Sequence, residues 1–280
     1  MFSYQHIYHA GGPADVVKHA MLALLVSRMT AKPAPFSYFE THAGRGLYPL
    51  AAREMNKVGE YHQGFSKLWP LRSAVPESLF PLMDVLTALN PKGEPTCYPG
   101  SPSVAARLMR SVDTLHLCEG HPQERQALEA ACADAPRVNI YDADGPRRVP
   151  TLLPKAGGRA LVLIDPSYEV KTEYASTANT VKAILHKNPK TVVMVWYPLL
   201  PDARHQPLVE GLAALEVPAT YRAEVVWAEA GEKGAYGTGQ IIVNLPYELE
   251  VEFREAIAWL APVLGGAAGG WKDGFVHKPK

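Results

Sequence analysis

The stretch that decides the fold is LVLIDPSY, residues 161–168, in which a run of apolar residues stops at an acid, a proline and an aromatic residue. Four consecutive apolar residues without polar alternation indicate a strand that is covered on both faces, as in a parallel sheet. Ligands of open α/β sheets bind beyond the carboxyl ends of such strands. We therefore expect Asp165 and Tyr168 to lie where the chemistry takes place.

The end of this stretch is similar to the Asp/Asn-Pro-Pro-Tyr/Phe signature of S-adenosylmethionine-dependent methyltransferases that act on amino nitrogens, with Ser167 in place of the second proline. An exocyclic amine of adenine is a poor nucleophile because its lone pair is delocalised into the ring. A carboxylate at Asp165 and a backbone carbonyl would accept the amine hydrogens and localise that pair. The Tyr168 ring would receive a base taken out of its stack. Asp165, Pro166 and Tyr168 are therefore the candidate catalytic residues, although Asp-Pro also opens ordinary turns.

The composition fits a single α/β domain. With 280 residues, 47% of them hydrophobic, the chain can bury a full core and is somewhat long for a minimal domain, so we expect one domain over 1–280 that contains an insertion. No stretch approaches the roughly 18 uninterrupted apolar residues of a transmembrane helix, and the start lacks an export signal, which predicts a cytoplasmic protein without a membrane partner. The cysteines, Cys97, Cys118 and Cys132, form no close pair, so no disulfide framework or zinc site is indicated.

The charge balance limits how the chain can bind nucleic acid. Lys and Arg number 28 and Asp and Glu number 28, so the net charge is zero. This argues against a protein that binds long nucleic acid mainly through phosphates. A nucleic-acid role would depend on a local basic face, for which the candidates are Lys18, Arg45, Arg53, Lys57, Lys272, Lys278 and Lys280.

Strand-like and helix-like patterns alternate along most of the chain, which predicts a Rossmann-like methyltransferase sheet of seven strands. In residues 51–99, prolines and charged residues interrupt short helical patterns and no strong strand appears, so we expect a small inserted helical subdomain there. The last two strands lie close in sequence and are expected to pair antiparallel. The expected helices are 14–29, 79–89, 101–110, 123–133, 175–186, 208–215 and 248–260, and the expected strands are 36–40, 114–118, 138–141, 161–164, 191–196, 221–227 and 240–245.

Candidate cofactor residues follow the first three of these strands in order. Gly44 lies in a glycine turn where the backbone can pass close to a ligand, although Pro49 breaks the dinucleotide fingerprint. Glu119 ends the second strand, where a carboxylate can accept hydrogen bonds from both hydroxyls of a ribose. Asp144 follows the third strand and would approach the adenine of a cofactor. Each residue alone also fits an ordinary strand end or turn, but together they predict a nucleotide cofactor.

Other reaction classes lack their motifs. No H-E-x-x-H or related histidine pair is present, so no metal site is expected. There is also no Pro-Cys dipeptide, which marks cytosine-C5 methyltransferases, and no G-x-S-x-G elbow of a hydrolase. His19 and His42 would contact the methionine part of the cofactor, with a purely structural histidine as the alternative in each case.

Segments spread over nearly the whole chain resemble the bacterial 23S ribosomal RNA adenine-N6 methyltransferases of the RlmJ type. These segments are SYQH (3–6), HAG (9–11), ADVVKH (14–19), THAGRG (41–46), YPGSP (98–102), IDPSY (164–168) and WYP (196–198). The resemblance implies a monomeric enzyme that uses S-adenosylmethionine and carries a helical subdomain inserted in a Rossmann-like fold. It implies cofactor contacts at His19, His42, Ser101, Glu119, Asp144 and Gly145, to which we add Gly44 and Asp165. It further implies that Asp165 engages the target amine and that Tyr4 contacts RNA, to which we add Lys18.

The sequence therefore predicts methyl transfer from S-adenosylmethionine to N6 of an adenine in 23S ribosomal RNA. One alternative keeps the chemistry and changes the substrate to DNA adenine. Another is a non-catalytic RNA-binding protein that kept the fold, which Ser167 and the neutral charge leave open. The presence of Asp165, Tyr168 and Glu119 argues against it, because a binder has no need of an acid beside a cofactor pocket.

Overall fold

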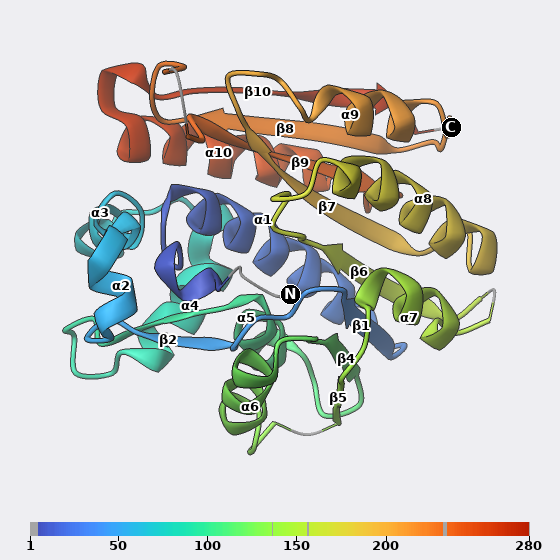
Figure 1. Cartoon of the computed structure of the whole chain (residues 1–280), viewed down its shortest axis with the longest axis horizontal. Coiled ribbons are helices and arrows are strands. Elements are labelled where there is room, and N and C mark those ends of the chain that lie inside the picture. The colour runs from blue at the N-terminus through green and yellow to red at the C-terminus, as the bar shows by residue number, and fades with distance from the viewer. Residues whose placement is uncertain (1–4, 136, 156, 232–233, 280) are drawn as a thin grey trace.

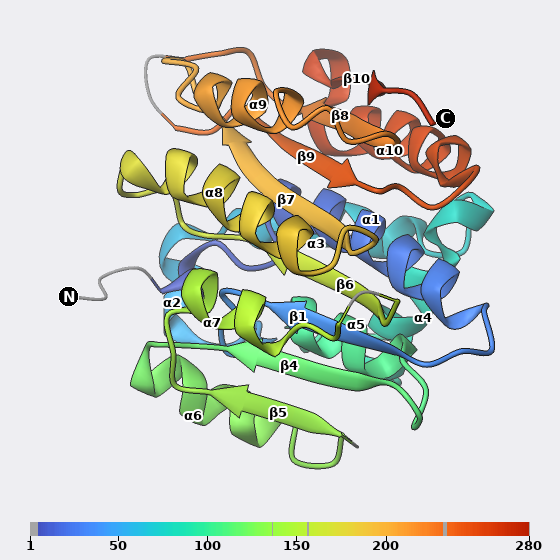
Figure 2. The same cartoon turned by 90° about the vertical axis from the view of Figure 1, so that its right-hand side faces the viewer.

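The computed structural model describes residues 5–135, 137–155, 157–231 and 234–279. Its centre is an eight-stranded sheet in the order β10-β8-β9-β7-β6-β1-β4-β5, with helices on both faces (Figures 1 and 2). Neighbouring strands among β5, β4, β1, β6 and β7 pair in parallel, whereas β9 is antiparallel to both β7 and β8 and β10 is antiparallel to β8. The strands are β1 (Phe36–Glu40), β4 (Thr114–Cys118), β5 (Val138–Tyr141), β6 (Arg159–Ile164), β7 (Val192–Leu199), β8 (Thr220–Val226), β9 (Gly237–Val243) and β10 (Gly270–His277).

The order of the strands fixes where a ligand can bind. From β1 the chain proceeds outward to β4 and β5, and then returns to the other side of β1 to form β6 and β7. The direction of strand addition therefore reverses at β1, and the carboxyl ends of β1, β4 and β6 border a crevice. The expected Rossmann-like fold is confirmed, and so is the antiparallel pairing of the two strands that became β8 and β9.

The apolar run of β6 supplies both layers of the core. Leu161 and Leu163 belong to one hydrophobic cluster, and Val162 and Ile164 belong to the other. Because side chains of a strand alternate between the faces of a sheet, a strand buried on both faces needs an uninterrupted apolar run. The first cluster includes residues of α1 (Pro13–Thr30), α4 (Phe80–Leu89), α5 (Ser101–Leu108), α6 (Pro122–Ala131) and α10 (Leu249–Gly265), and the second includes residues of α7 (Gly145–Leu152), α8 (Thr172–Lys187) and α9 (Gln206–Ala213).

Residues 51–99 are mainly helical, as expected, but they share the main core. Phe65, Leu68 and Leu82 belong to the same cluster as α1 and α10. The three-residue strand β3 (Cys97–Pro99) pairs antiparallel with β2 (Leu47–Pro49), a small sheet that the sequence did not predict because strands of this length carry no periodicity. The interpretation of 51–99 as an inserted subdomain stays a prediction. The remaining elements here are α2 (Arg53–Val58), α3 (Phe65–Leu68) and the 3-10 helices η2 (Glu60–His62), η3 (Trp69–Leu71) and η4 (Glu77–Leu79).

A strand at the end of the chain was also missed. Residues 270–277 form β10, which pairs with β8 at the edge of the sheet. In the described ranges, no helix combines the length and the apolar character needed to cross a bilayer.

Candidate active site

A cavity of about 850 Å³ opens at the carboxyl ends of β1, β4, β6 and β7. This volume lies within the range of small-molecule sites and leaves room for a nucleotide cofactor beside a base. Most of the residues that the sequence singled out line it, although they are far apart along the chain. They are Lys18, His19, His42, Gly44, Ser101, Glu119, Asp144, Gly145, Asp165 and Pro166.

The acid after β4 and the glycine turn after β1 lie against each other. The Gly44 N–H donates a hydrogen bond to Glu119 Oε2, and the His121 N–H donates one to Glu119 Oε1. The donor–acceptor distance is 2.7 Å in both. Gly44 has a φ of +63°, and a side chain there would approach the Tyr48 hydroxyl to 2.7 Å, so the turn requires glycine. Burial raises the pKa of Glu119, and the two backbone donors oppose this shift. Each oxygen of the Glu119 carboxylate keeps a lone pair that can accept a hydrogen bond from a hydroxyl group.

Gly145 brings the start of α7 into contact with the end of β1. A Cβ atom at this position would lie 1.9 Å from the Thr41 carbonyl oxygen, so no other residue fits without moving the backbone. Asp144 caps α7 and its side chain accepts from the Arg147 N–H over 3.4 Å. The turn after β5, which contains Asp144 and Gly145, therefore contacts the turn after β1 at the wall of the cavity.

Two histidines line the same cavity: His19, which is buried, and His42, which is half-buried. The His19 ring is 1% exposed and its Nδ1 is 2.9 Å from the Tyr98 hydroxyl, whereas its Nε2 has no partner among the described residues. Burial lowers the pKa of His19 to about 3 and that of His42 to about 4, so both rings are neutral at pH 7. A buried ring nitrogen without a partner is costly, and one on a cavity wall fits a polar group of a ligand.

Glu40 is a site residue that the sequence reasoning missed. It ends β1, is fully buried, and its carboxyl group is hydrogen-bonded by the hydroxyls of Ser101 and Tyr38. Burial raises the pKa of Glu40 to about 8. The signal was a carboxylate as the last residue of a buried strand, which is the signal that identified Glu119. Ser101 thus stands between Glu40 and the cavity.

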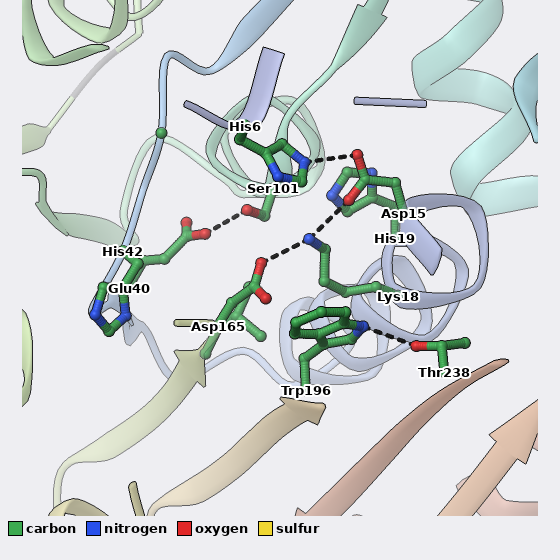
Figure 3. A network of polar contacts seen from close by, with 12 residues as sticks. His6, Asp15, Lys18, His19, Glu40, His42, Ser101, Asp165, Trp196 and Thr238 are labelled. Atoms are coloured by element: carbon green, nitrogen blue, oxygen red, sulfur yellow. Dashed lines mark hydrogen bonds and ion pairs between the residues drawn. The ribbon is translucent and has the colours of Figure 1, made fainter. Parts of the chain in front are cut away.

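Asp165 follows β6 and pairs with Lys18 from α1 (Figure 3). The Lys18 Nζ lies 2.6 Å from Asp165 Oδ2 and 2.8 Å from Asp15 Oδ1, and the Lys18 side chain is 4% exposed. Burial alone lowers the pKa of Lys18, but the charges of Asp15 and Asp165 outweigh burial and hold this pKa above its ordinary value. Since the ammonium is buried and shared by two carboxylates, a contact of Lys18 with RNA stays a prediction.

The Tyr168 ring does not lie on the cavity wall. The sequence analysis expected it there, as the surface that receives the target base. Tyr168 is 4% exposed, and its ring stacks on that of Tyr174 with 4.3 Å between the ring centroids. Its hydroxyl donates a hydrogen bond of 2.8 Å to the Trp196 carbonyl oxygen. The residue has a φ of +54°, so the chain turns back into the core directly after Ser167. Trp196 is one of the aromatic residues that line the cavity, and its Nε1–H donates a hydrogen bond of 2.7 Å to Thr238 Oγ1 (Figure 3).

Other expectations concern the N-terminal segment, metal binding and the cysteines. Tyr4 lies outside the described residues. Within the described ranges there is no group of three or more His, Cys, Asp or Glu residues that could hold a metal ion. All three cysteines are free thiols.

Comparisons with known proteins bear on the whole chain. Residues 33–276 match the model of a family described as ribosomal RNA large subunit methyltransferase D, RlmJ. The ribosomal RNA large subunit methyltransferases J of Escherichia coli K12 and Haemophilus influenzae are 31% and 32% identical over 261 and 266 residues, which cover 93% and 94% of this chain and of theirs. A crystal structure of a protein from Legionella pneumophila is 31% identical and superposes with a TM-score of 0.90, covering 95% of this chain and 98% of that one.

Proposed function

We propose that this chain, which belongs to the RlmJ family of ribosomal RNA large subunit methyltransferases, methylates N6 of an adenine in 23S ribosomal RNA. The methyl donor is S-adenosylmethionine. The family agrees with the enzyme class, the donor and the kind of RNA expected from the sequence. The observation that carries the choice of target atom is the position of Asp165. Its carboxylate ends a buried strand on the wall of the cavity that also holds Gly44 and Glu119.

The chain offers a cradle that suits S-adenosylmethionine. Glu119 presents two oxygens to the ribose hydroxyls, Asp144 and Gly145 border the place of the adenine, and His19 offers its unpartnered Nε2 to the methionine part. The neutral state of His19 lets this nitrogen accept or donate a hydrogen bond. When it is bound, S-adenosylmethionine supplies an electrophilic methyl group.

Asp165 is placed to prepare the amine. One of its oxygens, Oδ2, is held by Lys18, and the other makes no further hydrogen bond to a described residue. That oxygen would accept a hydrogen of the adenine amine, so that the nitrogen lone pair is drawn out of the ring and is fixed in direction. The amine must lose a proton after methylation, and the same oxygen can accept it.

The partner and the setting are proposed with the reaction. Large-subunit RNA is the substrate, the enzyme acts as a monomer in the cytoplasm, and Tyr4 and Lys18 are the candidate RNA contacts. The family does not favour a DNA adenine methyltransferase or a binding protein without activity. A neutral chain is expected to recognise RNA by a few contacts near the cavity and not by a broad basic face.

The test is methylation of protein-free 23S RNA that lacks its native modifications. With labelled S-adenosylmethionine, the label should appear as N6-methyladenosine, and Asp165→Asn should abolish turnover while the fold persists. Asp84→Asn, at an exposed position of α4, is the matched control and should leave turnover unchanged. Label only in DNA or in another nucleoside would contradict the assignment, and near-normal turnover of Asp165→Asn would make the acid a mere turn former.

A further inference from the structure

We propose that Asp15 is a positioning residue for methyl transfer: it holds the Lys18 ammonium against one oxygen of Asp165 and ties this pair to the N-terminal segment. The inference rests on the proposed function, because it assigns Asp165 the task of engaging the target amine. Asp15 lies in the segment ADVVKH (14–19), from which the sequence analysis assigned a role only to Lys18 and His19. The residue emerges from a network of contacts that joins segments far apart in the chain (Figure 3).

The Asp15 carboxylate accepts three donors although it is only 2% exposed. Its Oδ1 binds the Lys18 ammonium at 2.8 Å, and its Oδ2 accepts from the Gly11 N–H at 3.0 Å and is 2.8 Å from His6 Nε2. Asp15 and Lys18 are three residues apart on α1, so they share one face of that helix. The carboxylate therefore has little freedom to move, and neither has the ammonium that it holds.

Burial makes the second carboxylate necessary for the charge of Lys18. Moving an ammonium out of water costs several kcal/mol even after relaxation, as a rough figure, and one ion pair often fails to offset that cost. For Lys18, two carboxylates offset the cost of burial, and their combined negative charge raises the pKa of the lysine. In return, the nearby His6 and Lys18 outweigh burial and hold the pKa of Asp15 well below its usual range. Without Asp15, the buried Lys18 would face Asp165 alone and would lose its proton more easily.

The position of the ammonium decides how much of Asp165 stays available. An ammonium has three N–H donors; one reaches Asp15, one reaches Asp165 Oδ2, and the Trp196 ring centroid lies 5.7 Å from Nζ for a cation–π contact. Held in this way, Lys18 cannot move across to bind both oxygens of Asp165. The second oxygen remains open for the amine of the target base.

Asp15 also connects the catalytic acid to the part of the chain that precedes α1. His6 lies in the 3-10 helix η1 (His6–Tyr8), and Gly11 lies in the turn between η1 and α1. Tyr4, the candidate RNA contact, comes two residues before His6. A displacement of this segment when RNA binds would therefore reach Lys18 and Asp165 through a single carboxylate.

The charged and titratable groups that face Lys18 come from several elements. Asp15 and His19 belong to α1, His6 to η1, Glu40 to the end of β1 and Asp165 to the end of β6. Burial keeps His19 neutral and Glu40 largely protonated at pH 7, since their pKa values lie at about 3 and about 8. Asp15 and Asp165 are thus the groups whose negative charge sustains that of Lys18.

The experiment is Asp15→Asn in the full-length protein, assayed from neutral to alkaline pH with 23S RNA. We expect turnover to fall by about 100-fold, the cost of displacing a reacting group by about an ångström, while the affinity for S-adenosylmethionine stays within about twofold. The wild-type rate should stay level up to the ordinary lysine pKa of about 10.4 and beyond it, because the pKa of Lys18 is held above that value. The rate of the variant should decline at lower pH, because Lys18 loses its proton earlier. A purely structural role would not move this alkaline limb.

Two further variants keep the test decisive. Asp15→Glu retains the charge and should keep the wild-type alkaline limb with a reduced rate, and it replaces Asp15→Asn if that variant does not fold. Asp84→Asn, exposed on α4, should match the wild type throughout. The pKa of Lys18 can also be followed without RNA by NMR of ¹³Cε-labelled lysine, with Lys18→Arg to assign the signal. An unchanged Lys18 pKa and turnover in Asp15→Asn would overturn the inference, whereas a lowered Lys18 pKa in a protein that methylates no RNA would instead refute the proposed function.

Discussion

Removal of the Glu119 carboxylate is expected to weaken cofactor binding more than it weakens the fold. Both oxygens of Glu119 are already fixed by backbone donors at 2.7 Å, from Gly44 and from His121. An ionised carboxylate has about four lone-pair sites, so about one further site on each oxygen can take a ribose hydroxyl. The carboxylate is therefore oriented before the cofactor arrives, and binding does not have to order it.

The magnitude follows from the kind of hydrogen bond that is lost. Hydrogen bonds to charged groups contribute roughly 1.5 to 3 kcal/mol. At about 1.4 kcal/mol for each factor of ten, Glu119→Ala should raise the Kd for S-adenosylmethionine roughly 10- to 150-fold. The variant also leaves two N–H groups without their acceptor, but Glu119 is only partly buried, so water can replace the carboxylate there. Glu119→Gln, which keeps one acceptor oxygen, should fall between alanine and the wild type.

Isothermal titration calorimetry with S-adenosylmethionine measures this loss directly. Asp142→Ala is a suitable control, because Asp142 is close to Glu119 in the fold at the end of β5, its side chain is 67% exposed and it pairs with Arg125. That variant should bind the cofactor like the wild type. An unchanged Kd in a folded Glu119→Ala protein would refute the ribose contact, and an equal loss in Asp142→Ala would indicate a general charge effect.

Two more predictions concern Ser167 and Glu40. Ser167→Pro should raise the free energy of unfolding by about 0.4 to 1 kcal/mol and leave turnover equal or higher. Little is lost with the Ser167 hydroxyl, because it makes only a 3.5 Å contact with the Glu169 N–H. A lower Tm together with slower methyl transfer would mean that the serine loop has its own geometry. Glu40→Gln should flatten the dependence of Tm on pH. The raised pKa of Glu40, about 8 against an ordinary 4.5, makes its stabilising contribution complete below pH 4.5 and progressively lost as the pH rises to about 8. Thermal melts near pH 5.5 and 8.5, with the exposed Glu129→Gln as control, test this, and a wild-type slope in Glu40→Gln would contradict it.

The fold class could be predicted because its signals are local. The apolar run before Asp165 is long enough to identify a strand buried on both faces, and the order of strands and helices then restricts the topology. The same reasoning failed for β10. Gly270, Lys272, Asp273 and Gly274 break any strand pattern there, and the segment becomes a strand because β8 offers a free edge. Its charges are matched across the sheet, with Lys272 bound to Glu224 at 2.6 Å, a partnership that no window of sequence contains.

The candidate site was predicted residue by residue but not as a network. Strand ends identified Glu119 and Asp165, because the carboxyl edge of a parallel sheet collects them. The contact between Lys18 and Asp165 joins residues 147 positions apart, so periodicity could not reveal it. Nor could the sequence tell that the Tyr168 ring turns away from the cavity, because this depends on a positive φ at that residue and on the rings of Tyr174 and Trp196.

The ion pairs also narrow where RNA can be bound. Of the basic residues suggested by the sequence, Lys18 is bound to Asp165, Arg45 to Glu124 and Lys272 to Glu224, and all three acids are less than one-eighth exposed. A cation that already neutralises a protein carboxylate contributes less to the release of counterions from phosphates, so a contact of Lys18 with RNA would be with a base and not with a phosphate. Arg53 and Lys57 differ, because both are exposed on α2, and the Lys57 Nζ lies 5.5 Å from the ring centroid of Tyr8 in η1. The positive charges of Arg53 and Lys57 thus lie on a helix that contacts η1, the segment that Asp15 connects to Asp165, and we expect these two side chains to contact RNA phosphates.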